Sequence, residues 1–348
     1  MVGIFDHEFN QHRVGSKNTY VTFIDRFISQ FFMAKPKLNT VVLDFVGAAG
    51  ASIVNIPKCL SLVNRKSYRQ GYVYSVDFIE VIADSPNQFF RVGKLPENYN
   101  TLAAYRLGFH NWKSQRAEAS GESGVEPGKW SDFKPYYNEA HYLDDGTLTE
   151  LHPRGFDTAL LDLQELDRGG SEWNMADMVV HEVTAPGTTT NFAVGMLGDD
   201  NLAAAPGPYG SLINAWGDMR AAVMSPDPLM PTVASESWIG KTGAMNADMS
   251  QNIIGLIEEE NDKPPYANQA DVTLPPTYVG NLQSAPWGMM VDKTTTGSTG
   301  RPVSMDGGLF PLGYLVIANA GVEAYTLRVH CTRGTFKGVA ALPMGDFL

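Results

Sequence analysis

Residues 325–332 read YTLRVHCT, and this stretch decides the fold class. Apolar side chains alternate strictly with polar or charged ones along it, which is typical of a β-strand with one buried face. Neighbours in such a strand point to opposite faces, so His330 and Cys331 are predicted to lie on different sides of the sheet. Residues 312–318 precede this strand and residues 335–341 follow it after Arg333-Gly334, so three consecutive strands are predicted to close the chain.

Two further strands are predicted near the other end of the chain. Residues 72–82 read YVYSVDFIEVI, a β-branched and aromatic stretch that ends at Asp84-Ser85-Pro86. Residues 41–46 form a shorter β-branched run. Both compositions favour strands.

Three segments have helical spacing instead. Residues 19–33 place Tyr20, Phe23, Phe27 and other apolar residues on one face, before Pro36. This pattern is typical of an amphipathic helix, which either packs on the core of the protein or docks on a membrane or partner. Residues 100–119 have the same kind of spacing, and residues 156–166 show a weaker form of it.

Composition indicates how these elements are connected. With 43% hydrophobic and 18% charged residues, the chain can bury a sizeable core, which excludes a disordered protein. The 34 Gly and 21 Pro are spread along the chain and favour short strands joined by turns. Extended loops are predicted at 119–129, 198–210, 225–235 and 259–308. No fixed-period repeat is visible. We therefore expect a mainly β protein: a single β-sandwich with long loop insertions and a few short helices.

Within this one domain we expect a basic N-terminal segment, residues 1–70, followed by a sandwich over residues 71–348. The longest apolar stretch, residues 41–56, is interrupted by Asp44, so no membrane span is predicted. The N-terminus has no charged-then-apolar pattern, so a secretory signal is not indicated. The two cysteines, Cys59 and Cys331, are expected to be free buried thiols.

Sequence patterns of enzymes are missing. There is no G-x-S-x-G elbow, phosphate-binding loop or dinucleotide fingerprint, and no two of the seven histidines have H-x-x-x-H spacing. The acidic runs 144–145, 199–200 and 258–262 either hold calcium between copies or, as we favour, form solvated loops. We therefore predict a protein that is not an enzyme and has no cofactor and no metal site.

The charge is unevenly distributed. Residues 1–75 carry nine Lys and Arg against four acids, while the whole chain has a net charge of −12. An excess of positive charge at one end is expected where one face meets a polyanion, although ordinary solvated surface is an open alternative. Arg65, Lys66 and Arg69 alternate with Tyr68 and Tyr72, the combination that phosphates and stacked bases require. The candidate nucleic-acid-binding residues are Arg13, Lys17, Arg26, Lys35, Lys37, Arg65, Lys66 and Arg69.

Several motifs together resemble the capsid proteins of small circular Rep-encoding single-stranded DNA (CRESS-DNA) viruses. They are the helix that ends in WKSQR (112–116), PGKWSDFK (127–134), SEW (171–173), SPDP (225–228) and the final GTFKGVAA (334–341). The resemblance spans roughly residues 70–342.

The resemblance implies a jelly roll, a closed icosahedral shell of usually sixty copies, and a packaged circular single-stranded DNA genome. The protein would then be made in the host cell and reside in the virion, and its partners would be further copies of itself, the DNA and a host receptor. Such capsid proteins commonly begin with an arginine-rich arm, which this chain lacks.

Four aromatic residues are the candidate structural anchors that such a capsid protein would use, within or between copies: Trp112, Trp130, Phe133 and Trp173. Two other functions remain open. One is a carbohydrate-binding or carbohydrate-active jelly roll, and the other is a spike or tail protein of a phage that forms a trimer or ring.

Overall fold

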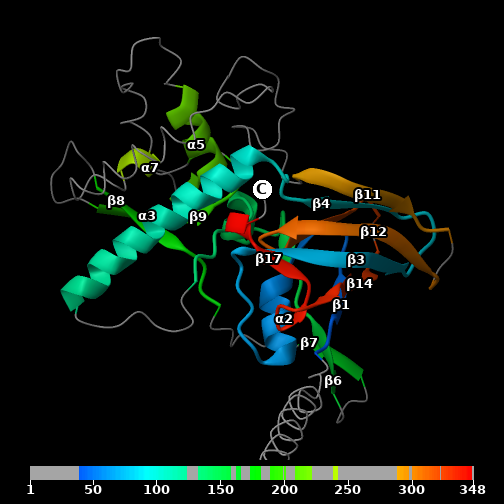
Figure 1. Ribbon diagram of the computed structural model, residues 1–348. Helices are drawn as coiled ribbons and strands as arrows, with labels where there is room; N and C mark the ends of the chain where they lie inside the picture. Colours follow the sequence, from blue (N-terminus) through cyan, green and yellow to red (C-terminus); the bar gives the residue numbers. More distant parts are fainter. Residues whose placement is uncertain are drawn as a thin grey trace, which may run out of the picture. The chain divides into compact units, whose positions relative to one another are not determined.

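A computed structural model describes residues 39–123, 132–157, 162–165, 173–181, 189–198, 200, 208–221, 238–241, 288–297, 300–321 and 323–346 (Figure 1). The chain divides into two units, residues 1–39 and 40–348, and the description below concerns the second. The expected boundary at residue 70 therefore lies inside the sandwich. The reason is that β1 (Val42–Gly47) pairs along its whole length with β14 (Tyr325–Cys331).

Two antiparallel sheets form the centre of this unit. Sheet A contains β1, β14, β3 (Tyr72–Ala83) and β12 (Pro302–Pro311) in that order, and β17 (Ala341–Pro343) pairs with β3 beyond the end of β14. Sheet B contains β11 (Met289–Thr295), β4 (Phe89–Lys94), β13 (Tyr314–Asn319) and β2 (Gly50–Asn55) in that order. A short strand, β5 (Thr149–Glu150), pairs in parallel with β2 at the edge.

The inner faces of the two sheets pack on each other to form a β-sandwich. Val54 and Leu315 are cross-strand partners on sheet B, and Leu327 and Val81 are partners on sheet A; all four belong to one buried cluster. The rings of Phe90 and Tyr325 meet across the two sheets with their centroids 5.1 Å apart. Helix α2 (Ile56–Asn64) adds Ile56, Cys59 and Leu60 to the same cluster.

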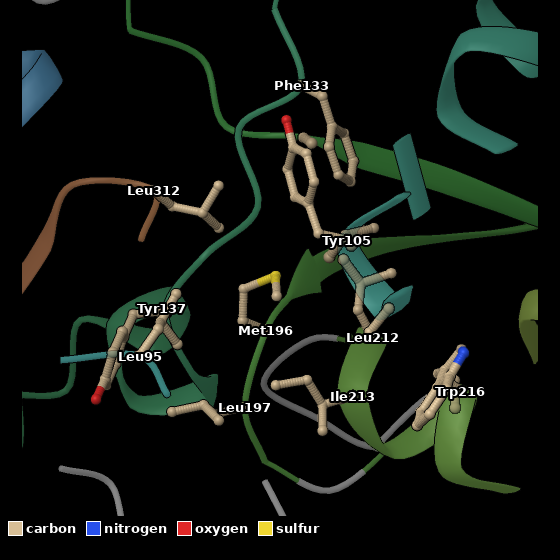
Figure 2. Close-up of a cluster of buried hydrophobic side chains, with 14 of the residues drawn as sticks. Leu95, Tyr105, Phe133, Tyr137, Met196, Leu197, Leu212, Ile213, Trp216 and Leu312 are labelled. Atoms are coloured by element: carbon tan, nitrogen blue, oxygen red, sulfur yellow. The ribbon is translucent and has the colours of Figure 1, made fainter. Parts of the chain in front are cut away.

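The outer face of sheet B is also covered. Its Ile53 and Val316 are paired and belong to a second buried cluster, to which residues between β4 and β11 contribute most of the side chains (Figure 2). The elements of this insertion are α3 (Tyr99–Ser123), α4 (Glu139–Leu143), β5, β6 (Arg154–Asp157), β7 (Asp162–Glu165), β8 (Asp177–His181), β9 (Thr189–Gly195), β10 (Tyr209–Ser211), α5 (Leu212–Ala221) and α7 (Trp238–Lys241). Strands β10, β9 and β8 form a third, small sheet.

The outer face of sheet A carries polar side chains. His330 Nε2 lies 3.1 Å from a Glu80 oxygen there, while Cys331 is buried on the inner face, so the predicted alternation is confirmed. Both cysteines are free and buried, as expected. Burial raises the pKa of the Cys331 thiol to about 12.

The strands predicted at 41–46, 72–82 and 325–332 and the helix at 100–119 are confirmed by β1, β3, β14 and α3. The weak helix prediction for residues 156–166 is wrong, because Phe156 and Leu163 are cross-strand partners in the β6–β7 hairpin. The segment 335–341 is not one strand. Strands β15 (Arg333–Gly334) and β16 (Gly338–Val339) form a small hairpin, of which only β16 lies within 335–341. The segment ends at the first residue of β17, and a 3₁₀ turn, η2 (Met344–Asp346), follows β17.

Two predicted loops contain regular structure. The segment 259–308 holds β11 and the first part of β12, and 198–210 holds the start of β10. Helix α3 also continues to Ser123, beyond the expected loop start at residue 119. The predicted helix at 19–33 and the loop at 225–235 lie outside the described residues.

Candidate nucleic-acid interface

The connection between α2 and β3 carries three of the predicted basic residues, Arg65, Lys66 and Arg69. Helix α2 ends at Asn64, and its C-cap residue, Arg65, takes the left-handed conformation with φ 52°. The backbone N–H of Tyr68 donates to Ser61 Oγ at 2.9 Å, and the Tyr74 hydroxyl donates to the carbonyl oxygen of Arg69 at 2.6 Å. These bonds fix the backbone from which the basic side chains project.

A tight turn from the end of the chain lies against this connection. Phe336 and Val339 exchange two backbone hydrogen bonds of 3.1 and 3.0 Å. Lys337 and Gly338 between them have φ of 51° and 95°. Positive φ at both central residues characterises the type I′ turn, and such a turn favours glycine at a central position, as at Gly338. The hydroxyl of Tyr68 donates to the carbonyl oxygen of Lys337 at 3.0 Å, so the turn is tied to the connection.

Aromatic rings pack between the connection and the turn. The rings of Tyr72 and Phe336 are stacked, with centroids 4.3 Å apart and planes at 19°. Tyr68 meets Phe336 edge-on at 6.2 Å. The Lys337 ammonium lies 5.3 Å from the centroid of Phe336 and 5.8 Å from that of Tyr68. Tyr72 and Phe336 are half-buried, and Tyr68 is buried.

Positive charges gather around these rings. The pKa of the Lys337 ammonium is lowered, first by desolvation and then by repulsion from Arg69 and Lys66. Lys66 and Arg69 therefore each lie within electrostatic reach of Lys337. Arg65, Arg69 and Lys337 are exposed, and Lys66 is half-buried. We call Lys66, Tyr68, Arg69, Tyr72, Phe336 and Lys337 the hairpin cluster.

An acidic side chain limits the positive charge on one side of the hairpin cluster. Asp132 accepts a hydrogen bond of 3.0 Å from the backbone N–H of Gln70. Burial raises the pKa of this carboxyl group, while Lys134 and Arg69 lower it. Beyond Asp132, the Lys134 ammonium lies 4.7 Å from the centroid of the Trp173 ring. Chemically, the hairpin cluster therefore offers ammonium and guanidinium groups for phosphate oxygens, beside rings on which a base can stack.

The structure thus brings Arg65, Lys66, Arg69, Tyr68 and Tyr72 together. The turn residues Phe336 and Lys337 were not among the predicted binding residues. They join the others across more than 260 positions of sequence, and the only local signal is the Lys-Gly pair at the turn. The other predicted basic residues lie outside the described residues: Arg13, Lys17, Arg26, Lys35 and Lys37.

Three of the four candidate anchors lie among the described residues. Phe133 is fully buried in the second cluster, and Trp112 packs against that cluster with the two ring centroids 5.6 Å apart. Trp173 is half-buried against Lys134. These contacts are made within one copy of the chain. Trp130 lies outside the described residues.

The acidic runs that lie within the described residues have structural roles. Asp145 accepts a hydrogen bond from the Thr147 N–H at 2.9 Å. Asp200 accepts hydrogen bonds from Ser211 N–H at 2.7 Å and from the Trp238 indole at 3.1 Å. In the described part of the chain, no three His, Cys, Asp or Glu side chains are grouped so as to hold a metal ion.

No protein-family model matches this sequence, and comparisons with curated proteins and with solved structures found no match. Among the helices of the described ranges, none has the length and apolar character needed to cross a membrane.

Proposed function

We propose that this protein is a viral major capsid protein with a jelly-roll fold, which assembles into a closed icosahedral shell around circular single-stranded DNA. The observation that carries the proposal is the order of the strands in the two sheets. Numbered along the chain without β5 to β10, the eight sandwich strands give the orders 1-8-3-6 and 5-4-7-2.

This order supports a jelly roll because it is what two nested Greek keys produce. The first strand pairs with the last, the second with the seventh and the fourth with the fifth, so the chain folds back on itself as one long hairpin wrapped over two sheets. Eight-stranded jelly rolls are frequent in viral capsid and lectin domains. The long insertion and the CRESS-like motifs favour the capsid among these.

The hairpin cluster supports the second half of the proposal. Its cations would bind phosphate groups of packaged DNA, and the half-buried rings of Tyr72 and Phe336 would accept unpaired bases, while the buried Tyr68 would support them. The hairpin cluster would supply part of the DNA contact from the folded domain itself.

The proposal is tested by assembly of the purified full chain. We expect negative-stain microscopy and light scattering to show uniform closed particles, and a melting temperature that rises with protein concentration because copies stabilise one another. A stable monomer at about 50 µM over a range of salt and pH would refute the shell, and a defined trimer or ring would favour the spike or tail alternative. Tight glycan binding by such a monomer would instead favour a lectin-like role.

A further inference from the structure

A buried histidine lies where the insertion packs on sheet B. His141 belongs to α4 and is only 8% exposed. Its ring meets Tyr314 of β13 edge-on, with centroids 5.6 Å apart, and Tyr136 in the same way at 5.4 Å. The imidazole therefore forms part of the contact between the insertion and the sandwich.

One hydrogen bond fixes the protonation state of this ring. The backbone N–H of Tyr137 donates to His141 Nδ1 at 3.2 Å. A backbone N–H can only donate, so Nδ1 must carry a lone pair and the imidazole must be neutral. A proton on Nδ1 would remove this acceptor and place a charge among buried aromatic rings, where charge is costly.

The neighbouring charges do not compensate such a proton. Glu150 of β5 and Asp144 at the end of α4 favour the charged imidazole, while Lys58 of α2 opposes it. The Lys58 ammonium is also bound to the Glu150 carboxylate at 2.9 Å, which weakens the stabilisation that Glu150 can give to a charged imidazole. The rings of Tyr136 and Tyr314 contact the imidazole, and Tyr137 contacts it through its backbone N–H. All three tyrosines stay neutral, because burial raises the pKa of each hydroxyl. Desolvation by burial outweighs the effect of these charges and lowers the pKa of His141 to about 4.

The segment around His141 attaches the insertion to the sandwich. Tyr136 N–H donates to the carbonyl oxygen of Val194 at 2.7 Å, and Leu197 N–H donates to that of Tyr137 at 3.0 Å. At the other end, Leu151 N–H donates to the carbonyl oxygen of Ile53 in β2 at 2.8 Å. We call residues 136–151 and their contacts with β2, β9 and β13 the seam.

We infer that His141 is an acid-sensitive latch, whose protonation at mildly acidic pH opens the seam while the two-sheet sandwich stays folded. The sign follows from linkage. The closed seam holds a neutral imidazole and the open seam an ordinary one, so the open state binds more protons between the two pKa values. The latch is fully closed above pH of about 6.5, and its stabilisation is lost as pH falls from there towards about 4.

Hydrogen exchange of the full chain, read by mass spectrometry, tests this inference. With the pKa at about 4 in the closed seam and 6.5 in the open one, the opening constant should rise about 30-fold between pH 7.5 and pH 5. The hydrogen-exchange protection factors of amides in residues 136–151 should therefore fall by about the same factor, after correction for the intrinsic pH dependence of exchange. Amides of β14 should change far less, and equal changes in both segments would overturn the inference.

The matched variant is His141→Asn, because an Asn Oδ1 can accept the Tyr137 N–H and does not titrate. We expect its seam to lose the 30-fold response, whereas an unchanged response would assign the acid sensitivity to another group. If the variant does not fold, exchange at the His141 ring C–H of the wild-type protein, followed against pH, reports the pKa of the imidazole directly. A value near 6.5 in the folded protein would refute the latch.

Discussion

Removing the positive charge of the hairpin cluster should change how DNA binding depends on salt. The perturbation is the triple substitution Lys66→Gln, Arg69→Gln and Lys337→Gln. Lys66 and Arg69 each lie within electrostatic reach of Lys337, so one strand can contact all three. Each phosphate contact on a single strand contributes about 0.7 to the slope of log affinity against log salt, so three contacts contribute about 2. Between 50 and 200 mM salt, a fourfold range, the affinity advantage of the wild type should therefore shrink by about 20-fold.

The assay is fluorescence anisotropy with a labelled oligo-dT of about 20 nucleotides, at protein concentrations below those of assembly. A matched control carries the same loss of charge elsewhere: Arg91→Gln, Lys293→Gln and Arg301→Gln, three exposed cations. Arg301 precedes the pair Pro302–Ile82, about 30 Å along β3 from Tyr72, which is well beyond the screening length. The control should leave the slope nearly unchanged. An unchanged slope in the cluster variant, or equal slopes in both triple variants, would show that the hairpin cluster does not bind the DNA backbone.

Two further predictions separate stacking from charge and test the buried polar groups. Phe336→Leu removes the ring stacked on Tyr72 and should weaken binding to the same oligonucleotide by about 1–3 kcal/mol. The salt slope should stay the same, because stacking is not an ionic interaction. A changed slope with equal affinity would contradict this prediction. Tyr209→Phe removes a buried hydrogen bond of 2.5 Å to the Leu197 carbonyl oxygen and should cost about 1–3 kcal/mol in urea unfolding. Tyr137→Phe should cost close to nothing by the same measurement, since its buried hydroxyl has no partner among the described residues, and equal losses in the two variants would refute the distinction.

The sequence patterns predicted β1, β3 and β14 of sheet A and β13 of sheet B, but they missed β12 of sheet A and β2, β4 and β11 of sheet B. Strand β14 has one face in the core and one towards solvent, so its sequence alternates. Strand β13 is buried on both faces, because the insertion covers sheet B, and its sequence YLVIAN carries no alternation to mark its inner face. Strands β11 and β12 were concealed within a stretch rich in Gly, Pro and Thr.

The sequence predicted only part of the candidate site. Arg65, Lys66 and Arg69 are close in sequence, so their common location follows from the connection between α2 and β3. Phe336 and Lys337 reach them because β14 and β3 are neighbours in sheet A, and that pairing has no local signature in either segment. The seam has the same origin, since His141 and Tyr314 meet only through the packing of the insertion on β13.

The position of the insertion determines when the two sheets can form during synthesis on the ribosome. Lys94 and Met289 are cross-strand partners, so the insertion begins and ends at one place on sheet B. When β4 emerges, the strands that flank it, β11 and β13, still lie about 195 and 220 residues further along the chain. At about 5–20 residues per second, the half-finished sheets wait some 10–40 s with their edges unpaired. During that interval the unpaired strand edges of the half-formed sheets are open to pairing with another chain, which is a route to aggregation.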